Sequence, residues 1–323
     1  MNDATAAGRL GFGMGLIDRF LVSRAAPLVF GCITLAENWF VRGSLSRAPI
    51  VHDETAYLFQ AKVFSSGRWV ADPPPLPEFF EQFQVLVTPV FAGKYPPGHS
   101  LVLVPGIWLG AAGLVPLLLA GIAGGLIFLL ARRHSNGWVA LMTWLIWSTS
   151  PGALRFLTSY LSQNTSLVLC LLGWWSLGNW LRKKNTGWLA LSLALGAFAI
   201  LTRPFTAVAL AAPAVFVVAR EILRRGNWSE VAVAVVPAGL ILALLPIWSA
   251  KTTGDPLTTP YTLYSRIYFP YQRPGFGLPD EIAPQRKLPP EMELYAEQHR
   301  TMHSGYTLRT VPGQLVERLG AIG

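Results

Sequence analysis

A series of apolar stretches constrains the fold of this chain more than any other feature of its sequence. Only 13% of the 323 residues are charged, whereas soluble domains usually carry about 25% charged residues. Several of the 12 tryptophans stand near the ends of these stretches, where their amphipathic rings would meet a membrane–water interface. The sequence therefore predicts an all-α polytopic membrane protein with about seven transmembrane helices, at about 27–41, 114–131, 137–150, 164–181, 187–201, 205–219 and 231–249.

The formal net charge of +9 comes from short basic blocks between the apolar stretches. A basic patch on one soluble face would indicate nucleic acid, but membrane topology explains this spacing better, and no nucleic-acid partner is predicted. Basic residues favour cytoplasmic loops. They gather in the N-terminal segment and at 132–133, 182–184 and 220–225, whereas the opposite short loops hold only Arg155 and Arg203. We therefore expect a multi-pass protein of the cell membrane, the inner membrane in a Gram-negative bacterium, with a cytoplasmic N-terminus.

A polar loop at residues 46–98 follows the first apolar stretch and is predicted to lie on the outer side. Within it, Ala56, Phe59 and Val63 share one face of an expected amphipathic helix at 53–66. A second helix is expected along the membrane surface at 99–110, because that segment is apolar but too short to span a bilayer.

Two adjacent carboxylates, Asp53 and Glu54, open this loop, and Lys94 stands near its end. Neighbouring helical residues point about 100° apart, so one carboxylate can act as a base while the other caps the helix or binds a partner. Helix capping alone also explains an acidic residue at this position. Lys94 can contact a phosphate as a point charge, or it can be a solvated loop residue.

The remaining polar residues also allow two interpretations. Arg203 follows an apolar stretch, where it can reach the interface with its long side chain or bind a phosphate. The same two readings apply to Arg155. His99 lacks neighbours at metal-ligand spacing and is interpreted as an interface residue. Cys32 and Cys170 lie inside apolar stretches, which indicates small buried hydrophobes and not a metal site or disulfide.

The order of these motifs among the apolar stretches resembles the C-type (GT-C) integral-membrane glycosyltransferases, in particular the branch with the protein O-mannosyltransferases and the lipid A aminoarabinose transferases. The matching segments are 52–57, 94–97 and 201–204, with Arg203 where the family has lysine. The resemblance extends over residues 25–280. Family members often carry a further acid where this chain has Asn164, and they usually have more spans and a further C-terminal region.

The resemblance implies an inverting transfer of a sugar from a polyprenyl-phosphate donor to a hydroxyl of a lipid, glycan or protein acceptor on the outer face. It implies that Asp53, with Glu54 beside it, forms the catalytic pair, Asp53 being the general base, and that Lys94 stabilises the charge on the departing phosphate. No cofactor or metal is predicted. The full set of expected site residues adds Arg203 and Arg155 as phosphate ligands and Tyr57, His99 and Asn164 as substrate contacts.

Two domains are predicted: a GT-C-like transmembrane domain at 1–250 and a Pro- and Tyr-rich extracytoplasmic segment at 251–323. Two readings of this segment stay open: the protein stops abruptly, or the segment is part of a longer chain. Two other functions stay open. One is a transporter or flippase for a lipid or small molecule, although the apolar stretches hold few ionisable residues and show no repeat. The other is an inactive scaffold on a truncated transferase fold, in which Asp53 and Lys94 would lie far apart or face lipid.

Overall fold

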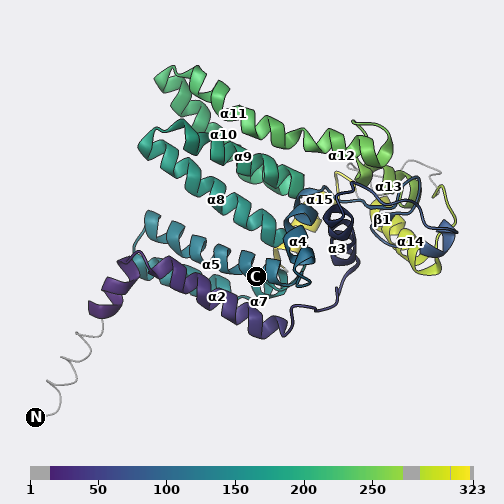
Figure 1. The fold of residues 1–323 in the computed structure, drawn as a ribbon, viewed down its shortest axis with the longest axis horizontal. Helices are drawn as coiled ribbons and strands as arrows, with labels where there is room; N and C mark the ends of the chain where they lie inside the picture. The colour runs from purple at the N-terminus through teal and green to yellow at the C-terminus, as the bar shows by residue number, and fades with distance from the viewer. Residues whose placement is uncertain (1–14, 272–283, 306, 321–323) are drawn as a thin grey trace, which may run out of the picture. The chain divides into compact units, whose positions relative to one another are not determined.

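A computed structural model describes residues 15–271, 284–305 and 307–320, and most of these residues are helical (Figure 1). The chain divides into two compact units. The first comprises Met1–Gly67 and Pro96–Leu245, and the second comprises Arg68–Tyr95 and Pro246–Gly323. The polar loop at 46–98 thus contributes residues to both units. The predicted boundary near residue 250 instead assigned the whole loop to the first domain.

The first unit is a set of packed helices. α2 packs on α5, α5 contacts α6 and α8, and α9 lies between α8 and α11 (Figure 1). The short helices α3 and α4 pack on each other. The bounds are α2 Ala26–Arg42, α3 His52–Ser65, α4 Gly98–Trp108, α5 Leu114–His134, α6 Gly137–Ser148, α7 Pro151–Leu157, α8 Ser162–Lys183, α9 Thr186–Thr202, α10 Pro204–Arg225 and α11 Trp228–Leu242.

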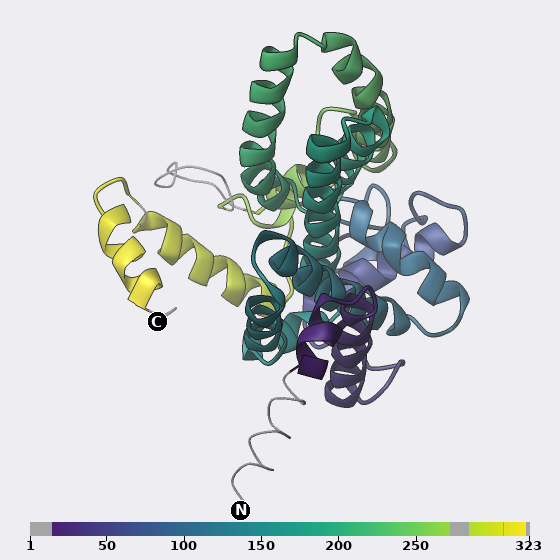
Figure 2. The same ribbon diagram turned by 90° about the vertical axis from the view of Figure 1, so that its left-hand side faces the viewer.

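Local signals in the sequence explain where several of these helices begin and end. Asn136 caps α6 by accepting a hydrogen bond from the Val139 amide, and Ser150 caps α7 in the same way. α10 ends at Gly226, whose φ of 68° suits glycine. Figure 2 shows α10 and α11 as two arms joined by the short turn that follows this glycine.

Glycines let α2 and α5 approach closely. A Cβ atom on Gly31 would lie 2.8 Å from the carbonyl oxygen of Gly121, and one on Gly125 would lie 2.8 Å from that of Pro27. Small residues at such crossings are typical of membrane helices, whose association depends on close van der Waals contact.

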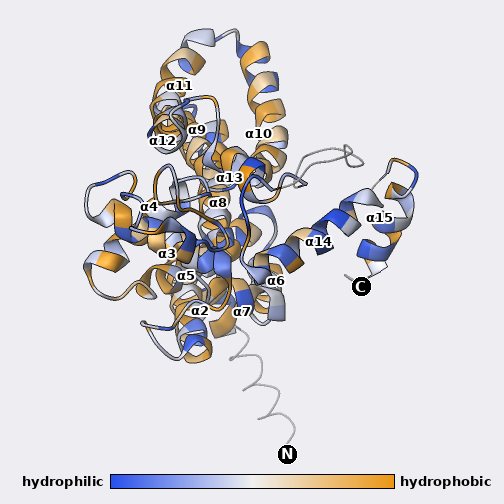
Figure 3. Cartoon of the chain, turned by 90° about the vertical axis from the view of Figure 1, so that its right-hand side faces the viewer, coloured by the Kyte–Doolittle hydropathy of each residue, from blue (hydrophilic) through white to orange (hydrophobic). Residues whose placement is uncertain are grey.

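Among the described residues, three helices are long and apolar enough to cross a membrane: α5, α10 and the continuous stretch Trp228–Thr253. A fourth span results if Gly15–Val22 and α2, bent by 90°, are taken together. Six of the seven predicted stretches each fall mainly on one helix, and 231–249 covers most of α11 and part of α12, Leu244–Thr253. The hydrophobic colouring in Figure 3 follows these helices. The all-α class is confirmed, whereas the count of seven spans and the surface position of α3 and α4 stay predictions.

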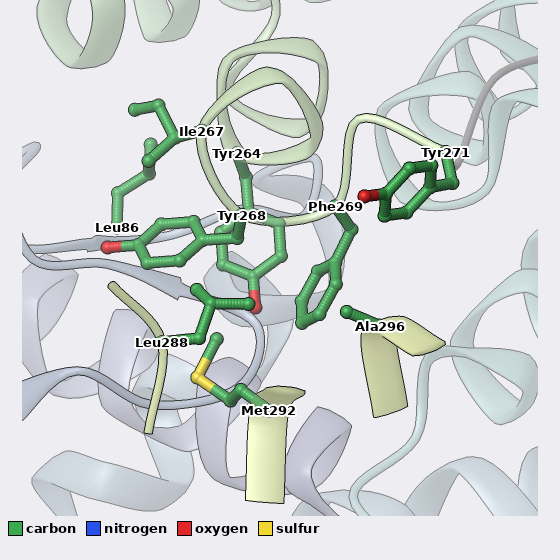
Figure 4. Packing of buried hydrophobic residues seen from close by; sticks show 9 residues of the cluster. All are labelled: Leu86, Tyr264, Ile267, Tyr268, Phe269, Tyr271, Leu288, Met292 and Ala296. Atoms are coloured by element: carbon green, nitrogen blue, oxygen red, sulfur yellow. The ribbon is translucent and has the colours of Figure 1, made fainter. Parts of the chain in front are cut away.

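The second unit packs short elements around an aromatic core, which contains Tyr264, Tyr268 and Phe269 (Figure 4). Strands β1 and β2 pair antiparallel with Val85 opposite Gly93. The elements of this unit are η1 Pro77–Phe80, β1 Val85–Leu86, β2 Ala92–Gly93, most of α12 Leu244–Thr253, α13 Pro260–Tyr268, α14 Pro290–Ser304 and α15 Val311–Gly320.

Candidate functional site

Glu54 is a buried helix cap. One carboxylate oxygen, Oε2, accepts hydrogen bonds from the backbone amides of Ile50 at 2.6 Å and Val51 at 3.2 Å. The other, Oε1, accepts one from the amide of Tyr160 at 2.8 Å, and only 3% of Glu54 is exposed. Both oxygens are therefore occupied by backbone donors. Of the two readings of the carboxylate pair, the structure gives Glu54 the capping position.

The Tyr160 segment is held from three helices. Besides the bond to Glu54 of α3, its carbonyl oxygen lies 2.7 Å from Nε2 of His99 on α4. The guanidinium of Arg42, at the end of α2, lies 4.3 Å from the centroid of the Tyr160 ring. These contacts fix the backbone just before α8, so that the position of Ser162 is set by α2, α3 and α4 together.

His99 is buried and uncharged. Burial lowers the pKa of its imidazole to about 4, so the ring is neutral at pH 7. A carbonyl can only accept, so Nε2 carries the proton and donates to Tyr160, while Nδ1 accepts from the Thr165 hydroxyl at 2.8 Å. Because both ring nitrogens are hydrogen-bonded within the protein, His99 supports the site by holding Tyr160 and Thr165 in place.

Tyr57, Ser162 and Arg203 form a chain of polar contacts that joins α3 to the start of α8 and of α10. The Tyr57 hydroxyl donates to Ser162 Oγ at 2.9 Å. Arg203 donates to the same oxygen at 3.3 Å and, through Nε, to Thr206 Oγ1 at 3.3 Å. Burial, and secondarily the Asp53 carboxylate, raises the pKa of Tyr57 to about 12, so the phenol stays protonated. Neither Ser162 nor Tyr160 was expected from the sequence, because no motif marks them.

Asp53 differs from its neighbour. It is half-buried at the first turn of α3, close enough to influence Tyr57 electrostatically. Across the described ranges, no hydrogen bond or ion pair involves its carboxylate. An acidic group without a protein partner next to a chain of polar contacts is available to accept a proton from a bound molecule.

Two other residues of this unit that were predicted for the site lie away from the Tyr57–Arg203 chain of contacts. Asn164 is buried on α8, and its amide nitrogen donates to the carbonyl oxygens of Pro116 at 2.9 Å and Leu157 at 3.4 Å. Arg155 is exposed on α7, and within the described segments it makes no hydrogen bond or ion pair with the Tyr57–Arg203 chain.

Lys94 belongs to the second unit and is only 4% exposed. Its ammonium lies 4.6 Å from the ring centroids of Tyr261 and Tyr264 and 5.3 Å from that of Tyr95. Aromatic faces attract a cation in this geometry. The predicted approach of Lys94 to Asp53 joins the two units and stays a prediction.

In the part of the chain that the structure describes, no group of three or more His, Cys, Asp or Glu side chains could hold a metal ion. The expectation of a metal-free, cofactor-free site stays a prediction.

Residues 107–249 match a family model described as dolichyl-phosphate-mannose-protein mannosyltransferase. The resemblance to the GT-C glycosyltransferases is confirmed. The match covers less than half of the chain but includes Ser162 and Arg203, whereas Asp53 and Lys94 precede it. With the apolar helices it indicates a membrane glycosyltransferase of the mannosyltransferase type. Comparisons with curated proteins and with solved structures found no match.

Proposed function

We propose that this protein transfers a sugar from a polyprenyl-phosphate donor to a hydroxyl of a lipid, glycan or protein acceptor on the extracytoplasmic face of the cell membrane, with its N-terminus in the cytoplasm. Within the glycosyltransferase class, the proposal rests on one observation. Of the two adjacent carboxylates, Glu54 is fully occupied by backbone amides, whereas Asp53 has no such partner in the described structure.

In the proposed step Asp53 is the general base. The acceptor hydroxyl attacks the anomeric carbon of the sugar as its proton passes to the Asp53 carboxylate. The bond between that carbon and the phosphate oxygen breaks, and the electron pair leaves with the polyprenyl phosphate. A single displacement of this kind inverts the configuration at the anomeric carbon. Neither a nucleotide nor a metal enters this balance.

Arg203 is the proposed phosphate ligand of the first unit. Its two hydrogen bonds to hydroxyl groups use Nε and one N–H of the guanidinium, and arginine has five N–H donors. The remaining donors can receive the negative charge that grows on the departing phosphate. Lys94 and Arg155 are kept as further proposed phosphate ligands, and Tyr57 as a contact for the substrate.

The test is a transfer assay with the purified full chain and a panel of polyprenyl-phosphate sugars, in which the product is identified by mass. Asp53→Asn keeps the shape of the side chain but removes the base, and general-base catalysis contributes about 10²–10⁴-fold. We expect turnover to fall by about that factor. Asp72→Asn is the matched control, because Asp72 is an exposed carboxylate whose partner is the exposed Arg68. Undiminished turnover of Asp53→Asn would reject the assignment.

A further inference from the structure

The ends of α5 and α8 bring two arginine side chains to one amide oxygen. Arg133, in the last turn of α5, donates to Oδ1 of Asn179 at 3.3 Å, and Arg182, in the last turn of α8, donates to the same atom at 2.9 Å. Because both nitrogens lie within 3.3 Å of one oxygen, they are separated by no more than twice that distance. Asn179 is only 4% exposed, so its amide is a fixed point on which both guanidinium groups converge.

A glycine of α8 leaves room for the Arg133 guanidinium. A Cβ atom on Gly178 would lie 2.7 Å from Nη2 of Arg133, and Nη1 also approaches the carbonyl oxygen of Trp175 at 3.5 Å. Arg133 is half-buried, whereas Arg182 is exposed. The backbone of α8 therefore positions one arginine of the pair, and the other stays accessible from outside the protein.

No acidic residue that the structure describes forms an ion pair with either arginine. Two nearby acids are paired with other cations: Glu221 contacts Lys184 and Arg224, and Glu230 contacts Arg225. A neutral amide oxygen does not cancel the repulsion between two positive charges. Each guanidinium has five N–H donors, so the pair can donate further hydrogen bonds to an anion.

Aromatic residues indicate that the arginine pair lies at the level of lipid headgroups. The rings of Trp175 on α8 and Trp188 on α9 meet edge to face, with centroids 5.0 Å apart. The ammonium of Lys183 lies 5.5 Å from the Trp188 centroid. Tryptophan gathers at membrane–water interfaces, and the apolar length of α5, which is long enough to cross a membrane, directly precedes Arg133. Lipid chains beside α5 would thus bring their headgroups next to the pair.

We propose that Arg133 and Arg182 bind the phosphate group of an anionic membrane lipid, with Lys183 as a third positive charge nearby. Guanidinium groups match the oxygens of a phosphate with paired N–H donors. Basic pockets between transmembrane helices hold anionic headgroups in this way. The hydrocarbon chains of the lipid stay in the bilayer, so the protein has to supply only the headgroup site.

This lipid site is separate from the proposed transferase site. Ser162 begins α8, and Asn179 lies near the other end of the same helix. The rise of an α-helix puts the two residues about 25 Å apart along its axis. A lipid held by the arginine pair would therefore leave the place next to Asp53 free.

The experiment measures lipid retained by the purified full chain in neutral detergent, by native mass spectrometry, with phosphatidylglycerol and phosphatidylcholine of identical acyl chains. Retention of the anionic lipid should exceed that of the zwitterionic lipid by about tenfold, the effect of one charge-assisted hydrogen bond. Inorganic phosphate at the same concentration should not displace the lipid, because it lacks the hydrocarbon. Equal retention of the two lipids, or displacement by inorganic phosphate, would overturn the proposal.

One variant with a matched control separates this site from a general effect of positive charge. Arg182→Gln should abolish the preference for the anionic lipid. Arg224→Gln removes one charge from α10, whose Glu221 contacts the end of α8 through Lys184, but Arg224 is already paired with Glu221. It should keep the preference. Equal loss in both variants would mean that net charge alone attracts the lipid, which would overturn the site.

A second variant keeps every charge. Gly178→Ala should displace the Arg133 guanidinium, which is the flexible end of its side chain, and so weaken the preference. Gly173→Ala on the same helix is its control, because the added Cβ would have its nearest neighbour 3.9 Å away. An unchanged preference in Gly178→Ala would contradict the proposed geometry. Because the readout is lipid mass, this failure is distinguishable from failure of the transfer reaction.

Discussion

Replacing Glu54 by alanine should destabilise the protein strongly, although the residue beside it is the proposed base. The change removes the acceptors of three backbone amides. Two of them belong to Ile50 and Val51, which are 68% and 38% exposed, so water can replace the carboxylate there. Loss of such a helix cap costs about 0.5–2 kcal/mol.

The third amide raises the cost. Tyr160 is only 3% exposed, so its N–H is left without a partner in a dry environment. Loss of a buried hydrogen bond to a charged group costs about 1.5–3 kcal/mol. Together the two contributions give about 2–5 kcal/mol in the free energy of unfolding. For a unit of this size, 1 kcal/mol shifts the thermal midpoint by about 2–4 °C, so Glu54→Ala should lower Tm by roughly 4–20 °C.

The assay is thermal unfolding of the purified protein in detergent, followed by near-UV circular dichroism. Asp53→Asn is the matched control, because the Asp53 carboxylate makes no hydrogen bond or ion pair within the described ranges. This substitution should change the free energy of unfolding by no more than about 0.5 kcal/mol, with a correspondingly small change in Tm. The two substitutions should thus have different effects: Asp53→Asn should impair turnover, and Glu54→Ala should impair stability. A Glu54→Ala variant as stable as the wild type would refute the reasoning.

Three further predictions follow from the same unit. His99 has its pKa lowered to about 4 by burial, so the unfolded state binds more protons between pH 4 and 6.5; stability should fall as pH drops through that window, by up to about 1.4 kcal/mol per pH unit, and His99→Gln should flatten this dependence of Tm on pH. Arg203→Ala should lower kcat/KM for the donor by about 10–100-fold in the transfer assay, the effect of lost charged hydrogen bonds, whereas Arg203→Lys, which restores the family's residue, should retain more activity; equal loss in both variants would argue against a phosphate contact. Gly31→Ala should destabilise by about 1–3 kcal/mol in thermal unfolding, because its Cβ would meet the Gly121 carbonyl oxygen at 2.8 Å, whereas Gly196→Ala, which has open space around it, should not.

The sequence by itself determined the helical class and the places of the helices. Apolar runs and their interruptions are local properties, so the predicted stretches are mainly helical, and the helix expected at 53–66 is α3, His52–Ser65. The order of the short motifs among the apolar stretches also indicated the resemblance to the GT-C transferases, which the family match over residues 107–249 supports. The apolar runs did not determine the number of spans, because helices such as α6 and α9 are shorter than a bilayer requires.

Only the tertiary structure decided which polar groups have partners. The residue pattern left open which of Asp53 and Glu54 caps the helix, although the resemblance implied Asp53 as the base. The structure distinguishes them because one of the amides that occupy Glu54 belongs to Tyr160, 106 residues away in the chain. Ser162 joins the site for the same reason, since its partner Tyr57 lies 105 residues away. Hydrogen bonds across such separations depend on how helices pack, and no periodicity in the chain encodes them.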